Sequence, residues 1–249
     1  APAAPAALVL DAPVEQAPPA RAEPSHPAES ASKPRRRTRF SLVVIREDAT
    51  DGERFALDEG ILTVGREGTN IEFPDDVYLD PMHASFDVSS AGVTVVDQGS
   101  LNGTFSRVNG TVPLQHGTEL RLGQQLLRFE AIDLVAPMHA PEDGTELLGG
   151  PIPGSAWGRL VTVIAPDLDG DAYLLEGPAV AVGREKGDIT FPGDGYVSSR
   201  HARLLSDASG SRIEDLGSSN GTYVRLMGPT AVRSGVLLLL GQQLFRLDG

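Results

Sequence analysis

The sequence contains an internal repeat, and this repeat constrains the fold more than any other feature. Residues 40–131 align with residues 158–249 at a constant offset of 118 positions without a gap, and 33 of the 92 aligned positions are identical. The repeats of solenoid proteins are only about 20–50 residues long, so a period of this length indicates two duplicated domains. We therefore predict two domains of the same fold, at residues 40–134 and 158–249.

Both repeats consist of short apolar runs broken by Gly, Asp, Pro and Asn. SLVVI, GVTVVD and QLLRFEAI are examples from the first repeat. These runs have the length of strands, and none keeps a 3.6-residue period over three turns, which favours strands over helices. Many short strands separated by turn signals are typical of a sandwich or barrel. The predicted fold class is all-β, with two tandem β-sandwiches.

Two segments lack this strand pattern. Residues 1–39 are rich in Ala and Pro and end in the basic run KPRRRTR, and residues 135–157 are rich in Pro, Gly and acidic residues. Segments with few apolar residues do not bury a core, so we predict a disordered N-terminal tail and a linker between the domains. The basic run has two interpretations, an anionic docking patch or a solvated tail, and the solvated tail is favoured.

Composition argues against several classes of function. The chain has no Cys, which excludes disulfides and Cys-ligated zinc, and its net charge of −13 argues against nucleic acid as a partner. The longest strongly apolar run covers residues 236–240, whereas a membrane span needs about 20 residues. No signal peptide is visible, and a cytoplasmic protein without a membrane partner is expected. The Asp75-Asp76 pair has no clustered partner, so it is interpreted as a solvated acidic loop, and no metal or cofactor is expected.

Charge is distributed unequally between the two repeats. Residues 40–134 hold six basic and sixteen acidic residues, a net charge of −10, whereas residues 158–249 hold nine and eleven, a net charge of −2. A field of one sign over a whole domain repels ions of that sign. The second repeat is therefore the one expected to keep a local site for an anion.

Three short elements recur in the same order in both repeats: Gly-Arg after a strand, a loop that ends in His, and Asn-Gly-Thr after a turn. A phosphate group needs a fixed cation and several neutral donors. Arg supplies a planar fork suited to phosphate oxygens, Ser hydroxyls add donors, and Gly lets the backbone approach closely. In the second repeat the elements are Gly183-Arg184, Ser198-Ser199-Arg200-His201 and Ser218-Ser219-Asn220-Gly221-Thr222.

This set of elements resembles the forkhead-associated (FHA) domain, a phosphothreonine-binding β-sandwich, over about 92 residues of each repeat. The resemblance implies a bacterial type of tandem FHA protein that is not an enzyme. It also implies a phosphothreonine-containing partner, such as a Ser/Thr kinase or its substrate, and a role for Asn220 in holding the ligand's main chain. The expected phosphothreonine-binding residues are Arg184, Ser198, Ser199, Ser219 and Asn220, and the expected supporting residues are Gly183, Arg200, His201, Arg203 and Gly221.

The first repeat departs from this pattern where the ligand would bind. Arg66, His83 and Asn102 are kept, but Asp80 stands at the position of Ser198. A carboxylate does not donate a hydrogen bond, and it repels phosphate at a cost on the order of several kcal/mol. We expect phosphate binding to fail here, with Asp80 paired to Arg66 in place of a ligand. Three further substitutions, Pro81, Met82 and Leu101, remove an N–H group, a positive charge and a hydroxyl group.

Several residues have a structural interpretation beside the functional one. His83 and His201 are kept in both repeats while other groups change, so a buried His that bonds the loop is favoured over a catalytic His. Asn-Gly is also a strong turn signal; a turn role alone is favoured for Asn102, and ligand contact for Asn220. Thr145, followed three residues later by Leu148, and Thr38 are candidate phosphorylation sites, although ordinary linker residues are favoured.

Two other classes of function stay open at this point. In the first, both domains are phosphate-independent scaffolds in a larger assembly. In the second, the sequence is the regulatory segment of a longer enzyme or transcription factor. Phosphopeptide recognition by the second repeat, with the first repeat as a spacer or phosphate-independent contact, is the favoured prediction.

Overall fold

The structure is a computed structural model that describes residues 37–132, 142–145 and 154–249. These residues form twenty strands and no α-helix, which confirms the predicted all-β fold class. With no helix in these ranges, none of them holds a helical membrane span. The predicted tail up to residue 36 and most of the predicted linker lie outside the described residues. The first strand begins at Arg37, three residues before the domain start predicted from the sequence.

Each repeat supplies ten strands. The first supplies β1 (Arg37–Ile45), β2 (Asp51–Asp58), β3 (Gly60–Gly65), β4 (Ile71–Glu72), β5 (Ala84–Val88), β6 (Val93–Asp97), β7 (Thr104–Arg107), β8 (Thr111–Pro113), β9 (Glu119–Leu122) and β10 (Gln125–Ala131). The second supplies β11 (Ala156–Ala165), β12 (Leu168–Glu176), β13 (Ala179–Gly183), β14 (Ile189–Thr190), β15 (Ala202–Asp207), β16 (Gly210–Asp215), β17 (Thr222–Arg225), β18 (Thr230–Val232), β19 (Leu237–Leu240) and β20 (Gln243–Asp248).

The strands form two sandwiches that share one long sheet. A ten-stranded sheet has the order β12-β11-β10-β9-β17-β7-β19-β20-β1-β2, and the two five-stranded sheets have the orders β4-β3-β5-β6-β18 and β14-β13-β15-β16-β8. In the first sandwich, β3–β6 and β18 face β1, β2, β7, β19 and β20 across one core. In the second, β8 and β13–β16 face β9–β12 and β17 across another core. Antiparallel pairing of β7 with β17 joins the two halves of the long sheet.

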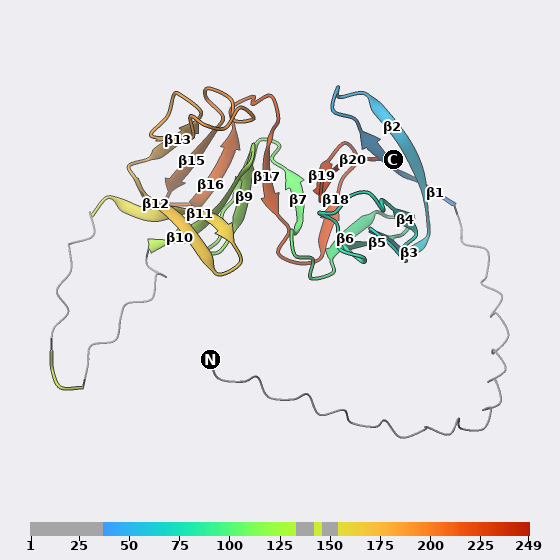
Figure 1. The fold of residues 1–249 in the computed structure, drawn as a ribbon, viewed down its shortest axis with the longest axis horizontal. Helices are drawn as coiled ribbons and strands as arrows, with labels where there is room; N and C mark the ends of the chain where they lie inside the picture. The colour runs from blue at the N-terminus through green and yellow to red at the C-terminus, as the bar shows by residue number, and fades with distance from the viewer. Residues whose placement is uncertain (1–36, 133–141, 146–153) are drawn as a thin grey trace, which may run out of the picture. The chain divides into compact units, whose positions relative to one another are not determined.

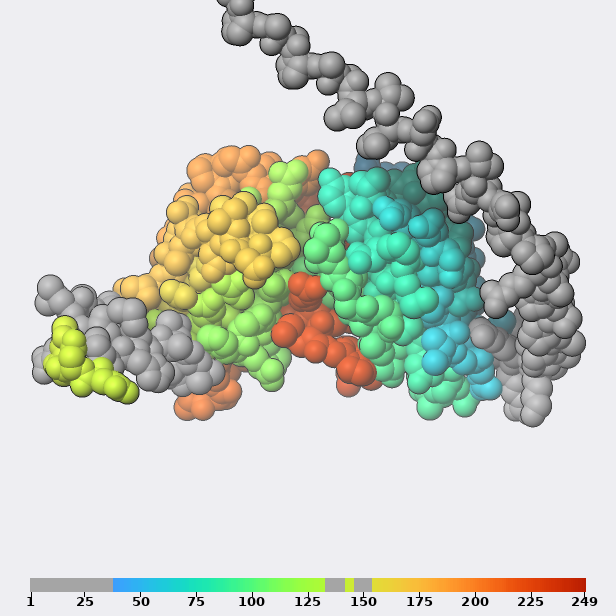
Figure 2. Space-filling view, turned by 60° about the horizontal axis from the view of Figure 1, so that its bottom comes forward, coloured from blue at the N-terminus to red at the C-terminus, as the bar shows by residue number. Residues whose placement is uncertain are grey.

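The last three strands of each repeat lie in the sandwich of the other repeat. β18, β19 and β20 pair with β6, β7 and β1, while β8, β9 and β10 pair with β16, β17 and β11. In Figure 1 the red strands β18–β20 accordingly lie with the blue and blue-green strands, and the yellow-green β9 and β10 lie with the yellow and orange ones. Figure 2 shows the red segment against the blue-green surface of the first repeat.

The apolar residues of the exchanged strands complete the two cores. Leu238 and Phe245 are fully buried together with Leu42 of β1. Leu120 and Phe129 are fully buried with residues of β11 to β16 in the same way. Burying a large apolar side chain contributes about 1.5–3 kcal/mol. Each sandwich therefore depends on both repeats for a substantial part of its core. The sheets are not divided at the predicted domain boundaries, 40–134 and 158–249. Those boundaries describe the repeats in the sequence and remain predictions.

A buried carboxylate holds the turn of each exchanged hairpin. Asp194 accepts hydrogen bonds from Gln124 N at 2.8 Å and from the Gln125 amide at 2.9 Å. Asp76 receives the equivalent bonds from Gln242 and Gln243, both at 2.9 Å. Only 4% of Asp76 is exposed, so the interpretation of Asp75-Asp76 as a solvated loop is wrong for Asp76. The acid is tolerated in the interior because three polar hydrogen atoms, including Tyr78 N–H, satisfy it.

The strand exchange reduces the difference in charge between the two halves. The first sandwich, residues 37–107 and 226–249, holds eight basic and fourteen acidic residues, a net charge of −6. The described part of the second, residues 108–132 and 154–225, holds nine and twelve, a net charge of −3. The expected contrast of −10 against −2 therefore does not describe the folded units. Local groups at each site, more than the overall field, must decide which sandwich accepts an anion.

Engineered disulfides test the exchange, because the chain has no Cys of its own. Cα partners in the sheet are Glu130 with Arg159 and Asp248 with Ser41. Glu130 and Asp248 are equivalent in the repeat, so without exchange Asp248 would lie beside Arg159 instead. We predict that Glu130→Cys with Arg159→Cys forms a disulfide in the oxidised monomer, measured by peptide mass spectrometry. The matched pair Arg159→Cys with Asp248→Cys should stay reduced, and a disulfide in that pair instead would contradict the exchange.

Candidate functional site

A glycine at the end of a strand lets the candidate binding loop cross close to the backbone. Gly183 ends β13, and a Cβ atom at this position would lie 2.3 Å from the carbonyl oxygen of Ser199. No larger residue fits there without moving the loop. The adjacent Arg184 N donates to the carbonyl oxygen of Ser198 at 2.9 Å. Gly-Arg thus brings the arginine directly beside the two serines of the loop.

A buried histidine ties this loop to the Asn-Gly turn. His201 Nδ1 accepts a hydrogen bond from Ser198 N at 3.0 Å, so the proton is on Nε2, which donates to the carbonyl oxygen of Gly221 at 3.1 Å. Burial lowers the pKa of His201, which favours this uncharged form. His83 makes the same two contacts, at 3.2 Å with Asp80 N and at 3.1 Å with Gly103 O. Both histidines therefore act as structural links, and neither is free for catalysis.

An aspartate that the sequence reasoning missed fixes the Asn-Gly turn. Asp215 accepts hydrogen bonds from the hydroxyls of Ser218 at 2.6 Å and Thr222 at 2.7 Å. Burial opposes ionisation of Asp215, but these hydrogen bonds outweigh it and lower the pKa of its carboxyl group. Ser218 Oγ in turn accepts from Gly221 N at 2.9 Å. The signal was available, because Asp97, Ser100 and Thr104 occupy the same positions in the first repeat.

The donors and acceptors that remain free face outward from this frame. Ser198 Oγ accepts from Ser219 N at 3.1 Å, which leaves its own hydroxyl hydrogen available to a ligand. Asn220 donates through Nδ2 to the carbonyl oxygen of Tyr196 at 2.8 Å, which leaves its Oδ1 available to accept. The hydrogen bonds between the two loops thus use the acceptor function of the Ser198 hydroxyl and the donor function of the Asn220 amide, and they leave the other function of each group available.

A glutamate next to the arginine was also missed. Glu185 accepts from Arg184 Nε at 3.2 Å, and its second oxygen accepts from the Ser199 hydroxyl at 3.4 Å. Arg184 and Ser199 are therefore brought together around one carboxylate group. The Arg184 side chain is 36% exposed and Glu185 is 58% exposed, so this ion pair is a weak surface contact.

Not every predicted supporting residue joins this cluster. Arg203 lies on β15 and donates two hydrogen bonds to Glu214 on β16, at 2.6 and 3.2 Å. It stabilises the sheet and is not brought to the loops. Arg200 is exposed beside the loop, and it has no ion-pair partner among the described residues. The described residues also contain no group of acidic and His side chains that could hold a metal ion.

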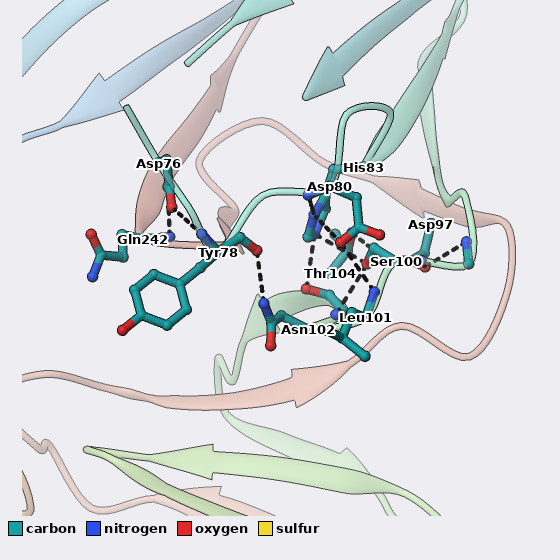
Figure 3. A network of polar contacts seen from close by, with 12 residues as sticks. Asp76, Tyr78, Asp80, His83, Asp97, Ser100, Leu101, Asn102, Thr104 and Gln242 are labelled. Carbon is teal, nitrogen blue, oxygen red and sulfur yellow. Dashed lines mark hydrogen bonds and ion pairs between the residues drawn. The ribbon is translucent and has the colours of Figure 1, made fainter. Parts of the chain in front are cut away.

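The first repeat keeps the frame and changes the surface atoms (Figure 3). Asp80 Oδ1 accepts from Leu101 N at 3.2 Å, the bond that Ser198 makes in the second repeat. Asn102 Nδ2 donates to the carbonyl oxygen of Tyr78 at 2.9 Å. The expected ion pair of Asp80 with Arg66 is not formed, although both are described residues. The basic group within 4.0 Å of the Asp80 carboxylate is His83 Nδ1, at 3.9 Å, because the carboxylate turns toward the Asn-Gly loop.

The two candidate phosphorylation sites lie in different surroundings. Thr38 is half-buried in β1, and its hydroxyl donates to the carbonyl oxygen of Leu57, so it is part of the sheet. Thr145 is exposed, with its N–H bonded to Asp143 at 2.9 Å. Leu148, which the Thr145 hypothesis invokes, lies outside the described residues.

Comparisons with known proteins relate both repeats to one family of domains. The model of the FHA domain family matches residues 62–123 and 180–241. The chain is 35% identical over 114 residues to the glycogen accumulation regulator GarA of Mycobacterium tuberculosis, covering 45% of this chain and 66% of that protein. It is 37% identical over 93 residues to the oxoglutarate dehydrogenase inhibitor of Corynebacterium efficiens, covering 36% and 66%. The matches thus span just under two thirds of the length of these relatives.

A solved structure is also similar to part of the chain. It comes from a structural and functional analysis of phosphothreonine-dependent FHA domain interactions and is 26% identical. The match covers 32% of this chain and 85% of that one, with a TM-score of 0.21.

The lowered pKa of His201 predicts a loss of stability in mild acid. Its folded-state pKa is below the ordinary value of about 6.5, so the contribution is complete above that pH and is lost as the pH falls below it. One group accounts for at most about 1.4 kcal/mol per pH unit. We predict a lower urea midpoint at pH 5.5 than at pH 7.5. His201→Gln should flatten this dependence while lowering stability at both pH values, and an unchanged slope in the variant would show that His201 is not its source.

Proposed function

Because this chain is a tandem FHA-domain protein, we propose that its second repeat binds phosphothreonine in a partner protein and that its first repeat does not. The observation that carries the proposal is the contrast between Ser198 and Asp80. Both side chains accept a hydrogen bond from the backbone N–H of the Asn-Gly loop, at 3.1 and 3.2 Å. The hydroxyl keeps a hydrogen that it donates to phosphate, whereas the carboxylate has none.

The second repeat presents one arginine and two serine hydroxyl groups to a negatively charged phosphate. The phosphate oxygens replace Glu185 as the acceptor for Arg184 and Ser199, and they also accept from the Ser198 hydroxyl. Hydrogen bonds to a charged group are worth roughly 1.5–3 kcal/mol each. Asn220 Oδ1 is placed to accept from the main chain of the ligand. Displacing Glu185 costs little, since the ion pair is exposed to solvent.

The first repeat would repel the same ligand. Asp80 places a negative charge where the phosphate would sit, Pro81 has no backbone N–H to donate, and Met82 has no positive charge. Arg66 alone does not compensate for these losses, because like charges placed together cost on the order of several kcal/mol.

A specific observation favours a phosphate-independent contact for the first repeat. Its loop region exposes apolar side chains: Val77 is 72% and Leu101 is 68% exposed, and Tyr78 and Met82 are about half exposed. Leu101 and Met82 stand where the second repeat has Ser219 and Arg200. An exposed apolar cluster of this kind is typical of a protein contact surface. The first repeat would then hold a partner whose phosphothreonine is bound by the second.

The names of the relatives support a regulatory role without catalysis. A regulator of glycogen accumulation and an inhibitor of a dehydrogenase are proteins that act on other proteins or pathways. The partner proposed for this chain is accordingly a protein phosphorylated by a Ser/Thr kinase, or the kinase itself. A phosphate-independent scaffold, or a regulatory segment of a longer enzyme or transcription factor, is the alternative outcome of the test below.

Binding of the full chain to a library of phosphothreonine peptides tests the proposal. We predict binding that requires the phosphate and that Arg184→Ala weakens by about 10- to 100-fold. This range corresponds to the loss of about one charge-assisted hydrogen bond. Fluorescence anisotropy with peptides chosen from the library measures the dissociation constants.

The first repeat supplies the matched control. Arg66→Ala removes the equivalent arginine and should leave the affinity unchanged, while Glu185→Gln should strengthen binding by removing the competing carboxylate. Equal weak binding of phosphorylated and unphosphorylated peptides by the intact chain and by Arg184→Ala would favour the scaffold. A loss with Arg66→Ala alone would place the site in the first repeat.

A further inference from the structure

Where β7 and β17 pair, each strand ends in an arginine that lies on the Asn-Gly loop of the other repeat. A Cβ atom on Gly221 would be 2.5 Å from Nε of Arg107, and a Cβ atom on Gly103 would be 2.4 Å from Nε of Arg225. Both glycines have positive φ, +84° and +77°. Because neither has a Cβ atom, each guanidinium group lies directly against the backbone of the loop. Arg107 belongs to the first repeat, and it therefore sits beside the proposed phosphothreonine loop of the second.

The two arginines differ in whether their charge is neutralised. Arg225 donates to Glu119 at 2.8 Å and to the carbonyl oxygen of Ser100 at 3.2 Å. The position equivalent to Glu119 is Leu237, so Arg107 meets an apolar side chain in place of a carboxylate. Among the described residues, no acidic group lies within ion-pairing distance of Arg107.

The charge of Arg107 reaches the residues around the loop. Burial raises the pKa of the Tyr223 phenol, and the positive charge of Arg107 acts against that rise. Tyr223 is the Cα partner of Arg107 across the β7–β17 pair. Arg107 is thus close to the strand that follows the binding loop, and the residue is half-buried, so that solvent screens its charge less than at an open surface.

A cavity of about 430 Å³ opens beside this arginine. Ser219 and Asn220, two of the proposed binding residues, form part of its wall together with Arg107. Three arginines and a single carboxylate, Glu47, line it. Of the other two arginines, Arg46 donates to the backbone and to a hydroxyl, and the third is held by aspartates. A ligand bound at Asn220 therefore lies beside a cavity that the first repeat helps to build, and Arg107 lines this cavity without an ion-pair partner among the described residues.

We propose that Arg107 binds an acidic side chain of the phosphothreonine ligand, close in sequence to the phosphothreonine itself. This inference rests on the proposed function of the second repeat. It adds that a residue of the first repeat selects the ligand of the second, because the strand pairing places Arg107 on the Gly221 loop. Leu237 is essential to this selectivity, since a glutamate there would neutralise the arginine as Glu119 neutralises Arg225.

The test compares a matched pair of peptides bound by the full chain. A phosphothreonine library identifies the flanking position at which Asp or Glu is enriched, and one selected peptide is made with the acid and with the corresponding amide. We expect the acidic peptide to bind about tenfold more tightly, equivalent to about 1.4 kcal/mol. Arg107→Gln should abolish this ratio and leave the affinity for the amide peptide unchanged. Added salt should reduce the ratio in the unmodified chain.

Three further variants separate this role from a general effect on folding. Arg225→Gln, the matched control, should keep the tenfold ratio, and Arg107→Lys should keep most of it. Leu237→Glu keeps Arg107 and should lose the ratio. Phosphate-dependent binding with no preference for the acid, or with equal losses for both peptides in Arg107→Gln, would overturn this inference and leave the proposed function intact. Absence of any phosphate-dependent binding would overturn both.

Discussion

The exchanged hairpin and the carboxylate that receives it support the rest of the structure. Asp194 binds Gln124 and Gln125 from the first repeat with one oxygen, and Tyr196 N, at 2.9 Å, with the other. The carbonyl oxygen of Tyr196 in turn accepts from Asn220. A continuous chain of hydrogen bonds therefore runs from one repeat to the Asn-Gly loop of the other. The position of that loop depends on both repeats, and a description of either one by itself leaves out part of its frame.

The two repeats share this frame of hydrogen bonds and differ in a few atoms at its surface. The buried His, the Asp-Ser-Thr network and the Asn amide bond occur in both, with nearly the same distances. What changes is the group that faces outward, a hydroxyl at Ser198 and a carboxylate at Asp80. Because the frame is the same in both repeats, the proposed difference in phosphate binding depends on the few side chains that face outward from it.

Much of the fold and part of the site were predictable from the sequence. The 118-residue offset and the short apolar runs predicted two all-β domains, and three motifs pointed to the loops that the structure brings together around Ser198. The strand exchange was not predictable, because both hairpins carry the same LGQQL stretch and present the same pattern to either core. The burial of Asp76 was missed for the same reason, since its partners, Gln242 and Gln243, lie 166 and 167 positions away. The role proposed for Arg107 depends on that pairing too.

We propose that phosphothreonine binds at the second repeat alone, within a frame built by both repeats. NMR of the isotope-labelled full chain, titrated with a phosphothreonine peptide chosen from the library, tests it most directly. We expect the backbone amide signals of Ser198, Ser219 and Asn220 to shift with the phosphorylated peptide and not with its unphosphorylated form. The signals of Asp80 and Asn102 should stay in place. Phosphate-dependent shifts at Asp80 and Asn102, with none at Ser198, would contradict it.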